Sequence, residues 1–90
     1  MYPENVVDIK EDTRVSYRDI GKLVFFKRGT ASWAGHVGII YSILSDKKMS
    51  LIEGNVKNAK GTKEGVFIKA RTLAGDGHLR PLAIVDVVKI

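Results

Sequence analysis

The chain alternates short apolar runs with clusters of glycine, lysine and small polar residues. The runs are rich in valine, isoleucine and phenylalanine, which favour strands, and turn-forming residues separate them. No stretch places apolar residues at helical spacing over the length of a long helix. The pattern therefore predicts a mainly β protein: a small antiparallel sheet of five to six strands that curls into a partial, SH3-like barrel. Strands are expected at residues 22–27, 35–44, 49–53, 65–71 and 82–90.

The first 19 residues follow a different pattern. They are polar apart from a weak apolar group at residues 6–9, and residues 12–19 are expected to form a short helical turn at most. We therefore expect an N-terminal polar segment, residues 1–19, ahead of one β-barrel domain, residues 20–90.

A predicted hairpin brings polar side chains together. The turn-like sequence Ser-Asp-Lys-Lys at residues 45–48 makes the flanking strands antiparallel neighbours. Because side chains alternate along a strand, His36 and Gly38 point to one face of the sheet. Glu53 and Asn55 on the neighbouring strand point to the same face. The pairing therefore places His36 close to Glu53 and Asn55. Gly38 leaves space beside the imidazole that a substrate or another backbone could fill.

This grouping is two parts of a nucleophile–base–orienter triad. A histidine can take a proton from a thiol, and a carboxylate or amide on its far ring nitrogen fixes the tautomer. Either Glu53 or Asn55 could be the orienter, and the other could stabilise an oxyanion or hold a turn. The alternative interpretation is structural: His36 ends a strand and residues 53–55 form a polar turn.

The usual nucleophile is absent, because the chain contains no cysteine. Disulfides and cysteine-bound zinc are excluded for the same reason. Ser16 is the nearest upstream hydroxyl, but it lies too close to the first expected strand of the barrel to act as the nucleophile. No metal site or cofactor is expected, and His78 is interpreted as a lone histidine in a surface loop.

Composition and charge bound the remaining possibilities. Ninety residues with 44% hydrophobic and 28% charged content fit one globular domain. No apolar run approaches the roughly 18–20 residues that span a bilayer, and the N-terminus lacks the apolar region of a secretory signal. The net charge of +5 favours anionic partners. Lys57, Lys60 and Lys63 form the densest basic stretch, which is either a binding surface or a solvated loop.

Four segments together resemble a known family. They read GKLVFFKRG, WAGHVGII, LIEGN and LRP, and they cover residues 20–82. This order resembles the C-terminal barrel half of the CHAP amidase/peptidase domain, a branch of the NlpC/P60 and papain-like cysteine hydrolases. The resemblance implies cleavage of amide or peptide bonds in bacterial peptidoglycan, in the cell envelope or by a phage lysin. It implies His36 as general base, Glu53 as orienter, Asn55 as a supporting residue and Trp33 beside the substrate groove.

The chain also departs from the family. The cysteine that opens an upstream helix in the family has no counterpart, and Lys22 stands where the family usually has aspartate. We therefore expect no hydrolysis by this chain alone. It is either half of a split enzyme, with an exposed apolar patch for a cysteine-bearing helical partner or a second copy, or an inactive relative that binds wall peptide. The alternative belongs to another class of function: a small basic SH3-like barrel that binds an anionic polymer or a protein. Among these partners, nucleic acid has the least support from the sequence.

Overall fold

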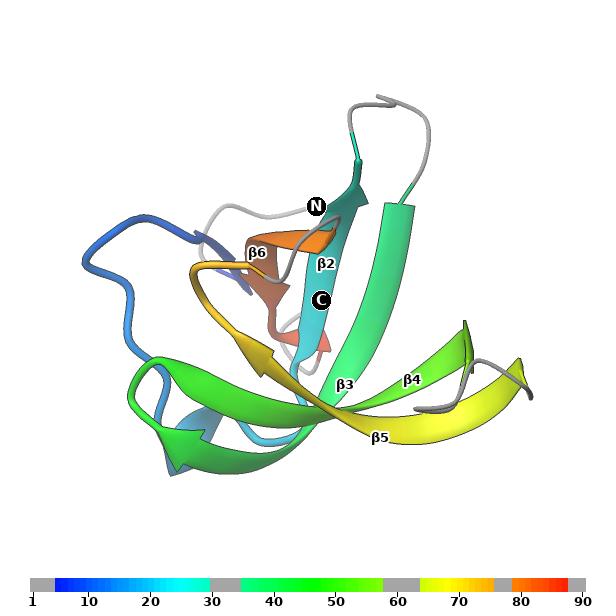
Figure 1. Cartoon of the computed structure of the whole chain (residues 1–90). Helices are drawn as coiled ribbons and strands as arrows, with labels where there is room; N and C mark the ends of the chain where they lie inside the picture. Colours follow the sequence, from blue (N-terminus) through cyan, green and yellow to red (C-terminus); the bar gives the residue numbers. More distant parts are fainter. Residues whose placement is uncertain (1–4, 30–34, 58–63, 76–78, 88–90) are drawn as a thin grey trace.

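The computed structural model describes residues 5–29, 35–57, 64–75 and 79–87, and for residues 55–57 and 64 it describes the backbone alone. Figure 1 shows a molecule built mainly of strands. Within the described residues the only helical elements are 3₁₀ turns, of which η2 is the longest, and none is long enough to cross a membrane. The elements are β1 (Val6–Asp8), η2 (Tyr17–Asp19), β2 (Leu23–Arg28), β3 (Gly35–Ser45), β4 (Lys48–Lys57), β5 (Glu64–Thr72) and β6 (Leu79–Val85).

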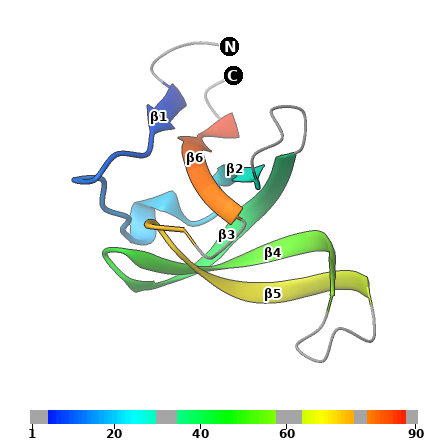
Figure 2. The ribbon, with the colours of Figure 1, turned by 45° about the horizontal axis from the view of Figure 1, so that its top comes forward.

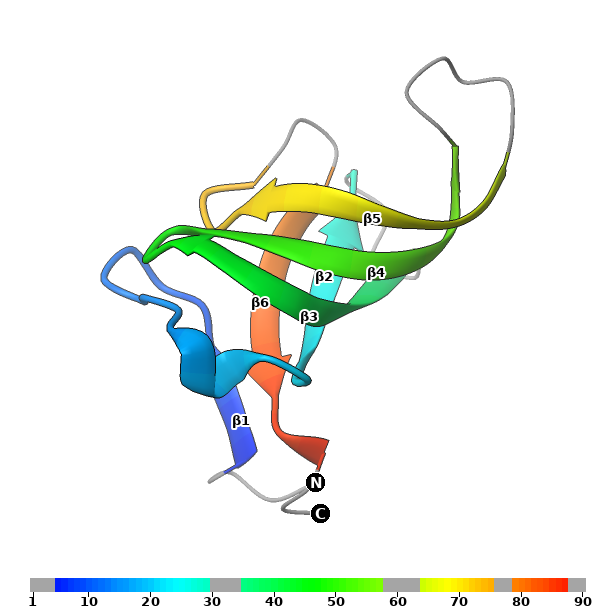
Figure 3. The same ribbon diagram turned by 90° about the horizontal axis from the view of Figure 1, so that it is seen from below.

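The described strands form one six-stranded sheet in the order β1-β6-β2-β3-β4-β5, and every neighbouring pair is antiparallel. β3 bends so that its first half lies beside β2 and its second half runs along β4 (Figure 1). Seen from two other directions, the sheet curls but stays open between its edge strands β1 and β5 (Figures 2 and 3). The predicted mainly β fold with a partial barrel is confirmed.

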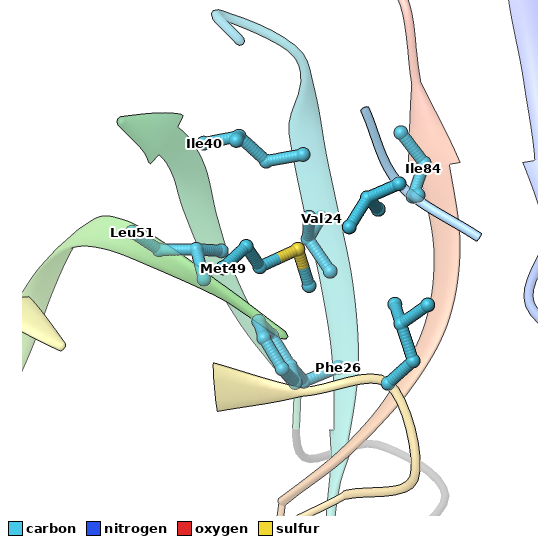
Figure 4. Packing of buried hydrophobic residues seen from close by; sticks show 8 residues of the cluster. Val24, Phe26, Ile40, Met49, Leu51 and Ile84 are labelled. Carbon is cyan, nitrogen blue, oxygen red and sulfur yellow. The ribbon is translucent and has the colours of Figure 1, made fainter. Parts of the chain in front are cut away.

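The concave side of the sheet holds the hydrophobic core. Its buried members come from β2, β3, β4, β6 and the connections, and Figure 4 shows their side chains converging between the strands. On β3 the buried positions Gly38 and Ile40 alternate with exposed ones, as the period-two pattern predicts, whereas on β4 Met49, Ser50 and Leu51 are all buried. The cluster comprises Val15, Val24, Phe26, Ile40, Met49, Leu51, Leu73 and Ile84.

The N-terminal residues belong to the same structural unit. β1 pairs with β6 along its whole length, and Val15 is buried in the core. The Val15 amide donates a 2.8 Å hydrogen bond to the Asp46 carbonyl in the β3–β4 turn. The described part of residues 1–19 is therefore integrated into the sheet and core rather than forming a separate polar segment. Residues 12–19 contribute only the single turn of η2, in line with the prediction.

Two strand boundaries differ from the prediction. β4 extends past the expected end at residue 53 to Lys57, with a register shift after Glu53. β6 begins at Leu79 rather than residue 82 and ends at Val85. It includes Pro81, which pairs with Phe26 where the register shifts. A bulge of this kind tolerates a proline, which cannot donate a hydrogen bond to the neighbouring strand. The strand can therefore begin before Pro81 rather than after it.

The outer face of the sheet is also apolar. Ile39, Ile52 and Ile68 form one cross-strand row over β3, β4 and β5, and Ile39 and Ile68 are 43% and 57% exposed. Val37 and Val66 flank this row and are exposed as well. Antiparallel sheets usually carry polar residues on their solvent face. The described part of the outer face is therefore an exposed apolar surface.

Candidate functional site

His36 and Glu53 meet where β3 and β4 run side by side. His36 is the second residue of β3, and its side chain turns to the concave side. Gly38 pairs with Glu53 in the register of the two strands, which brings the carboxylate next to the ring. His36 Nε2 lies 2.8 Å from Glu53 Oε1. The proximity predicted from the hairpin is confirmed, whereas a catalytic role for the pair stays a prediction.

Glu53 is held from its other side by an arginine. Arg71 Nε donates to Glu53 Oε2 at 2.9 Å, and Arg71 Nη2 donates to Oε1 at 2.6 Å. This two-pronged geometry fixes the plane of the carboxylate as well as its position. Glu53 is 1% exposed, so the ion pair lies inside the barrel. Arg71 was missed in the sequence, where it appears as one more basic residue at the end of a β pattern.

The environment of Glu53 keeps it ionised. Burial alone would raise its pKa, because desolvation disfavours the charged carboxylate. Hydrogen bonds from Arg71 and His36, together with the positive charge of Arg71, outweigh burial and hold the pKa of Glu53 below its ordinary value. A charged, oriented carboxylate on Nε2 is what a histidine base needs from an orienting residue.

Phe26 closes the cluster from β2. Its ring centroid lies 5.6 Å from that of His36, and the Arg71 guanidinium carbon lies 5.9 Å from the Phe26 centroid. Phe26 is itself buried in the hydrophobic core. An apolar ring against both polar partners excludes water and strengthens the electrostatic interactions around Glu53.

The second ring nitrogen of His36 contacts an exposed arginine. Arg28 Nη2 lies 3.3 Å from His36 Nδ1. A guanidinium can only donate, so in this arrangement Nδ1 accepts and the ring proton sits on Nε2, which donates to Glu53. Arg28, His36, Gly35, Val37 and Gly54 line a pocket of about 480 Å³. The arrangement can therefore present Nδ1 as a base to a group that enters this pocket.

Gly38 has a different role from the one expected. A Cβ at this position would lie 3.0 Å from both Glu53 Cγ and Leu51 Cδ2. The space above Gly38 is thus filled by these two side chains, and the expectation that it leaves room for a substrate is wrong. Its lack of a side chain allows Glu53 to approach the imidazole.

The remaining sequence candidates lie outside the side chains that the structure describes. The Asn55 side chain is not among the described ones, and the register shift between Glu53 and Val56 interrupts the simple alternation used to place it. Trp33 and His78 lie outside the described residues, as do Lys60 and Lys63. Among the residues that are described, no three histidine or acidic side chains converge to hold a metal ion.

A larger pocket lies elsewhere in the fold. It has a volume of about 590 Å³, with Ile9, Leu73 and Pro81 supplying apolar walls and Lys48 and Arg80 supplying positive charge. None of its lining residues belongs to the His36–Glu53–Arg71 cluster.

Comparisons with known proteins give no match: no protein-family model, curated protein or solved structure is significantly similar to this chain.

Proposed function

We propose that this chain is the β half of a CHAP-like cell-wall amidase or peptidase, with His36 as general base and Glu53 as its orienter. The 2.8 Å contact between His36 Nε2 and a buried, arginine-held Glu53 carries the proposal. A histidine–carboxylate pair with no functional role would not need a carboxylate that is so firmly held and so fully buried. The family resemblance supplies the substrate class, peptidoglycan, and the reaction, amide hydrolysis.

In the proposed reaction a cysteine thiol from a segment outside these 90 residues enters beside His36. Nδ1 takes the thiol proton, and the thiolate attacks the carbonyl carbon of the scissile amide. The new imidazolium is stabilised by Glu53, which remains ionised because Arg71 holds it. Nδ1 then returns the proton to the leaving amine as the carbon–nitrogen bond breaks, and a water molecule later releases the acyl group by the reverse sequence.

The missing nucleophile defines what the chain does alone. It would keep the base and a groove for wall peptide, and would bind without cutting. The apolar outer face around Ile39 and Ile68 supports the proposal that another protein surface, carrying the cysteine or a second copy of this chain, covers part of the sheet.

The test is sedimentation of the purified chain with peptidoglycan sacculi, combined with assay of released soluble fragments. We expect the chain to sediment with the sacculi and to release no fragments. Release of fragments that persists in His36→Ala would refute the assignment of His36, and a chain that stays in the supernatant would refute wall binding.

A second candidate is binding of an anionic polymer by a basic barrel. It is favoured by the larger pocket, where the exposed cations Lys10, Lys48 and Arg80 stand around apolar walls and Glu11 is the lone acid. A complex with DNA, RNA or a teichoic-acid-like polymer that weakens steeply with salt would favour this function. Binding to sacculi that persists at high salt would argue against it.

A further inference from the structure

The surface side of His36 carries a positive charge that the hydrolytic proposal leaves unused. Arg28 is the last residue of β2, and its guanidinium is exposed. Among the described residues, no acidic side chain forms an ion pair with it. Since Arg71 already balances Glu53, Arg28 adds one uncompensated positive charge beside the pocket in which Nδ1 of His36 is presented.

We infer that this pocket binds the carboxylate of a small acid or peptide through Arg28, and that binding uncovers Nδ1 of His36. The inference deepens the proposed function and rests on it for the biological substrate, which would carry a free carboxylate near the scissile amide. The binding step itself needs only the residues already described.

The shape of the pocket suits such a group. Its volume of about 480 Å³ is within the range of small-ligand sites. Two of its five lining residues, Gly35 and Gly54, have no side chain, and a Cβ at Gly54 would meet nothing within 4 Å. A ligand therefore has room to lie along the strand ends, with Val37 offering an apolar wall.

Arg28 binds a carboxylate more strongly than it binds a neutral imidazole nitrogen. In the present arrangement one of its five N–H groups approaches the neutral nitrogen Nδ1 at 3.3 Å. A carboxylate can accept two parallel bonds from a guanidinium, and charge-assisted bonds are roughly twice as strong as neutral ones. A bound carboxylate should therefore draw Arg28 away from the imidazole. Glu53 keeps hold of Nε2 while this happens, so the ring stays oriented and Nδ1 becomes free to act as a base.

The experiment is an NMR titration of the ¹⁵N-labelled chain with N-acetylglycine, following the ring nitrogens of His36. N-acetylglycinamide is the matched probe, since it keeps the amide and lacks the carboxylate. We expect a saturable shift of the Nδ1 signal with the acid and none with the amide. Arg28→Gln should weaken binding by roughly tenfold or more, because it removes hydrogen bonds to a charged group.

Arg14→Gln is the matched control variant. Arg14 is exposed and pairs with Asp46 just beyond the far end of β3 from His36, so its loss should leave the affinity unchanged. An equal response to the acid and the amide, no saturable shift, or equal weakening by both variants would overturn the inference. Tighter binding of inorganic phosphate than of N-acetylglycine would overturn the carboxylate as ligand class. Because no cell wall is present, the result is independent of the sedimentation test: either experiment can fail while the other succeeds.

Discussion

At the scale of single residues, the molecule is organised around one buried carboxylate. Glu53 receives two hydrogen bonds from Arg71 and one from His36, so its charge is compensated inside the barrel. Removing one partner of such a group leaves the other charge buried without compensation. Glu53 therefore contributes to stability and to the orientation of His36 through the same contacts.

Glu53→Gln should lower the free energy of unfolding by about 3–5 kcal/mol, because it removes the buried negative charge that binds the Arg71 guanidinium through two hydrogen bonds. Urea unfolding of the variant and the parent chain measures the difference. Asp46→Asn is the control, since it breaks the exposed Arg14–Asp46 pair and should cost less than about 1 kcal/mol. Equal losses for both substitutions would contradict a structural role for the buried pair.

The same carboxylate predicts how stability depends on pH. Its pKa in the folded protein is below its ordinary value, so its stabilising contribution is present above the unfolded-state pKa and is lost as the pH falls through the folded-state pKa. The parent chain should therefore lose more stability on acidification than Glu53→Gln does. Unfolding curves measured at falling pH should show the two chains converging, and a constant gap between them would contradict the ionised state of Glu53.

At the scale of elements, the β3–β4 hairpin determines the site. Its two-residue turn and two register shifts set Gly38 opposite Glu53, and the missing side chain of Gly38 leaves the space that Leu51 and Glu53 occupy. The precision of the His36–Glu53 contact therefore depends on a glycine whose backbone lies in an ordinary strand.

Gly38→Ala should destabilise the fold by about 1–3 kcal/mol, because the new methyl group overlaps Glu53 and Leu51 in a filled interior. Urea unfolding measures the cost. Gly54→Ala is the matched substitution on β4, where a Cβ meets nothing within 4 Å, and it should change stability by less than about 0.5 kcal/mol. A tolerated Gly38→Ala would mean that the site adapts more easily than its packing indicates.

The sequence predicts this hairpin well because the information is local. Period-two alternation and a tight turn suffice to bring His36 near Glu53 and to separate the core face from the outer face. They do not predict the two register shifts that set Gly38, rather than His36, opposite Glu53. Arg71 could not be found in this way, since it reaches Glu53 diagonally from a strand position that pairs with Met49. β1 was missed because three residues are too short for a pattern and gain their structure from pairing with β6.

At the scale of the whole molecule, the sheet has two apolar faces. The concave face is filled by the core, whereas the outer row through Ile39 and Ile68 faces solvent within the part of the chain that the structure describes. The net charge of +5 makes copies of the chain repel one another and favours monomers in solution. The contiguous apolar row has the opposite effect, because it favours association.

We expect the purified chain to self-associate with rising concentration through this outer face, in the absence of a partner that covers it. Light scattering should show a rising mean mass, and the double variant Ile39→Lys/Ile68→Lys should reduce it. Val7→Lys, an exposed apolar position on the opposite edge strand, is the control and should leave the mass unchanged. A chain that stays monomeric at every concentration would contradict the need for a covering surface.

The most direct test of the proposed base is the position of the proton on His36. A long-range ¹H–¹⁵N correlation spectrum at mildly alkaline pH, where imidazoles are neutral, distinguishes the two tautomers. We predict a proton on Nε2 that exchanges slowly with water, because Glu53 holds it inside the barrel, and a bare Nδ1 towards the pocket. A proton on Nδ1, or the mixed tautomers of a freely exposed histidine, would contradict the assignment of Glu53 as orienter and of His36 as base.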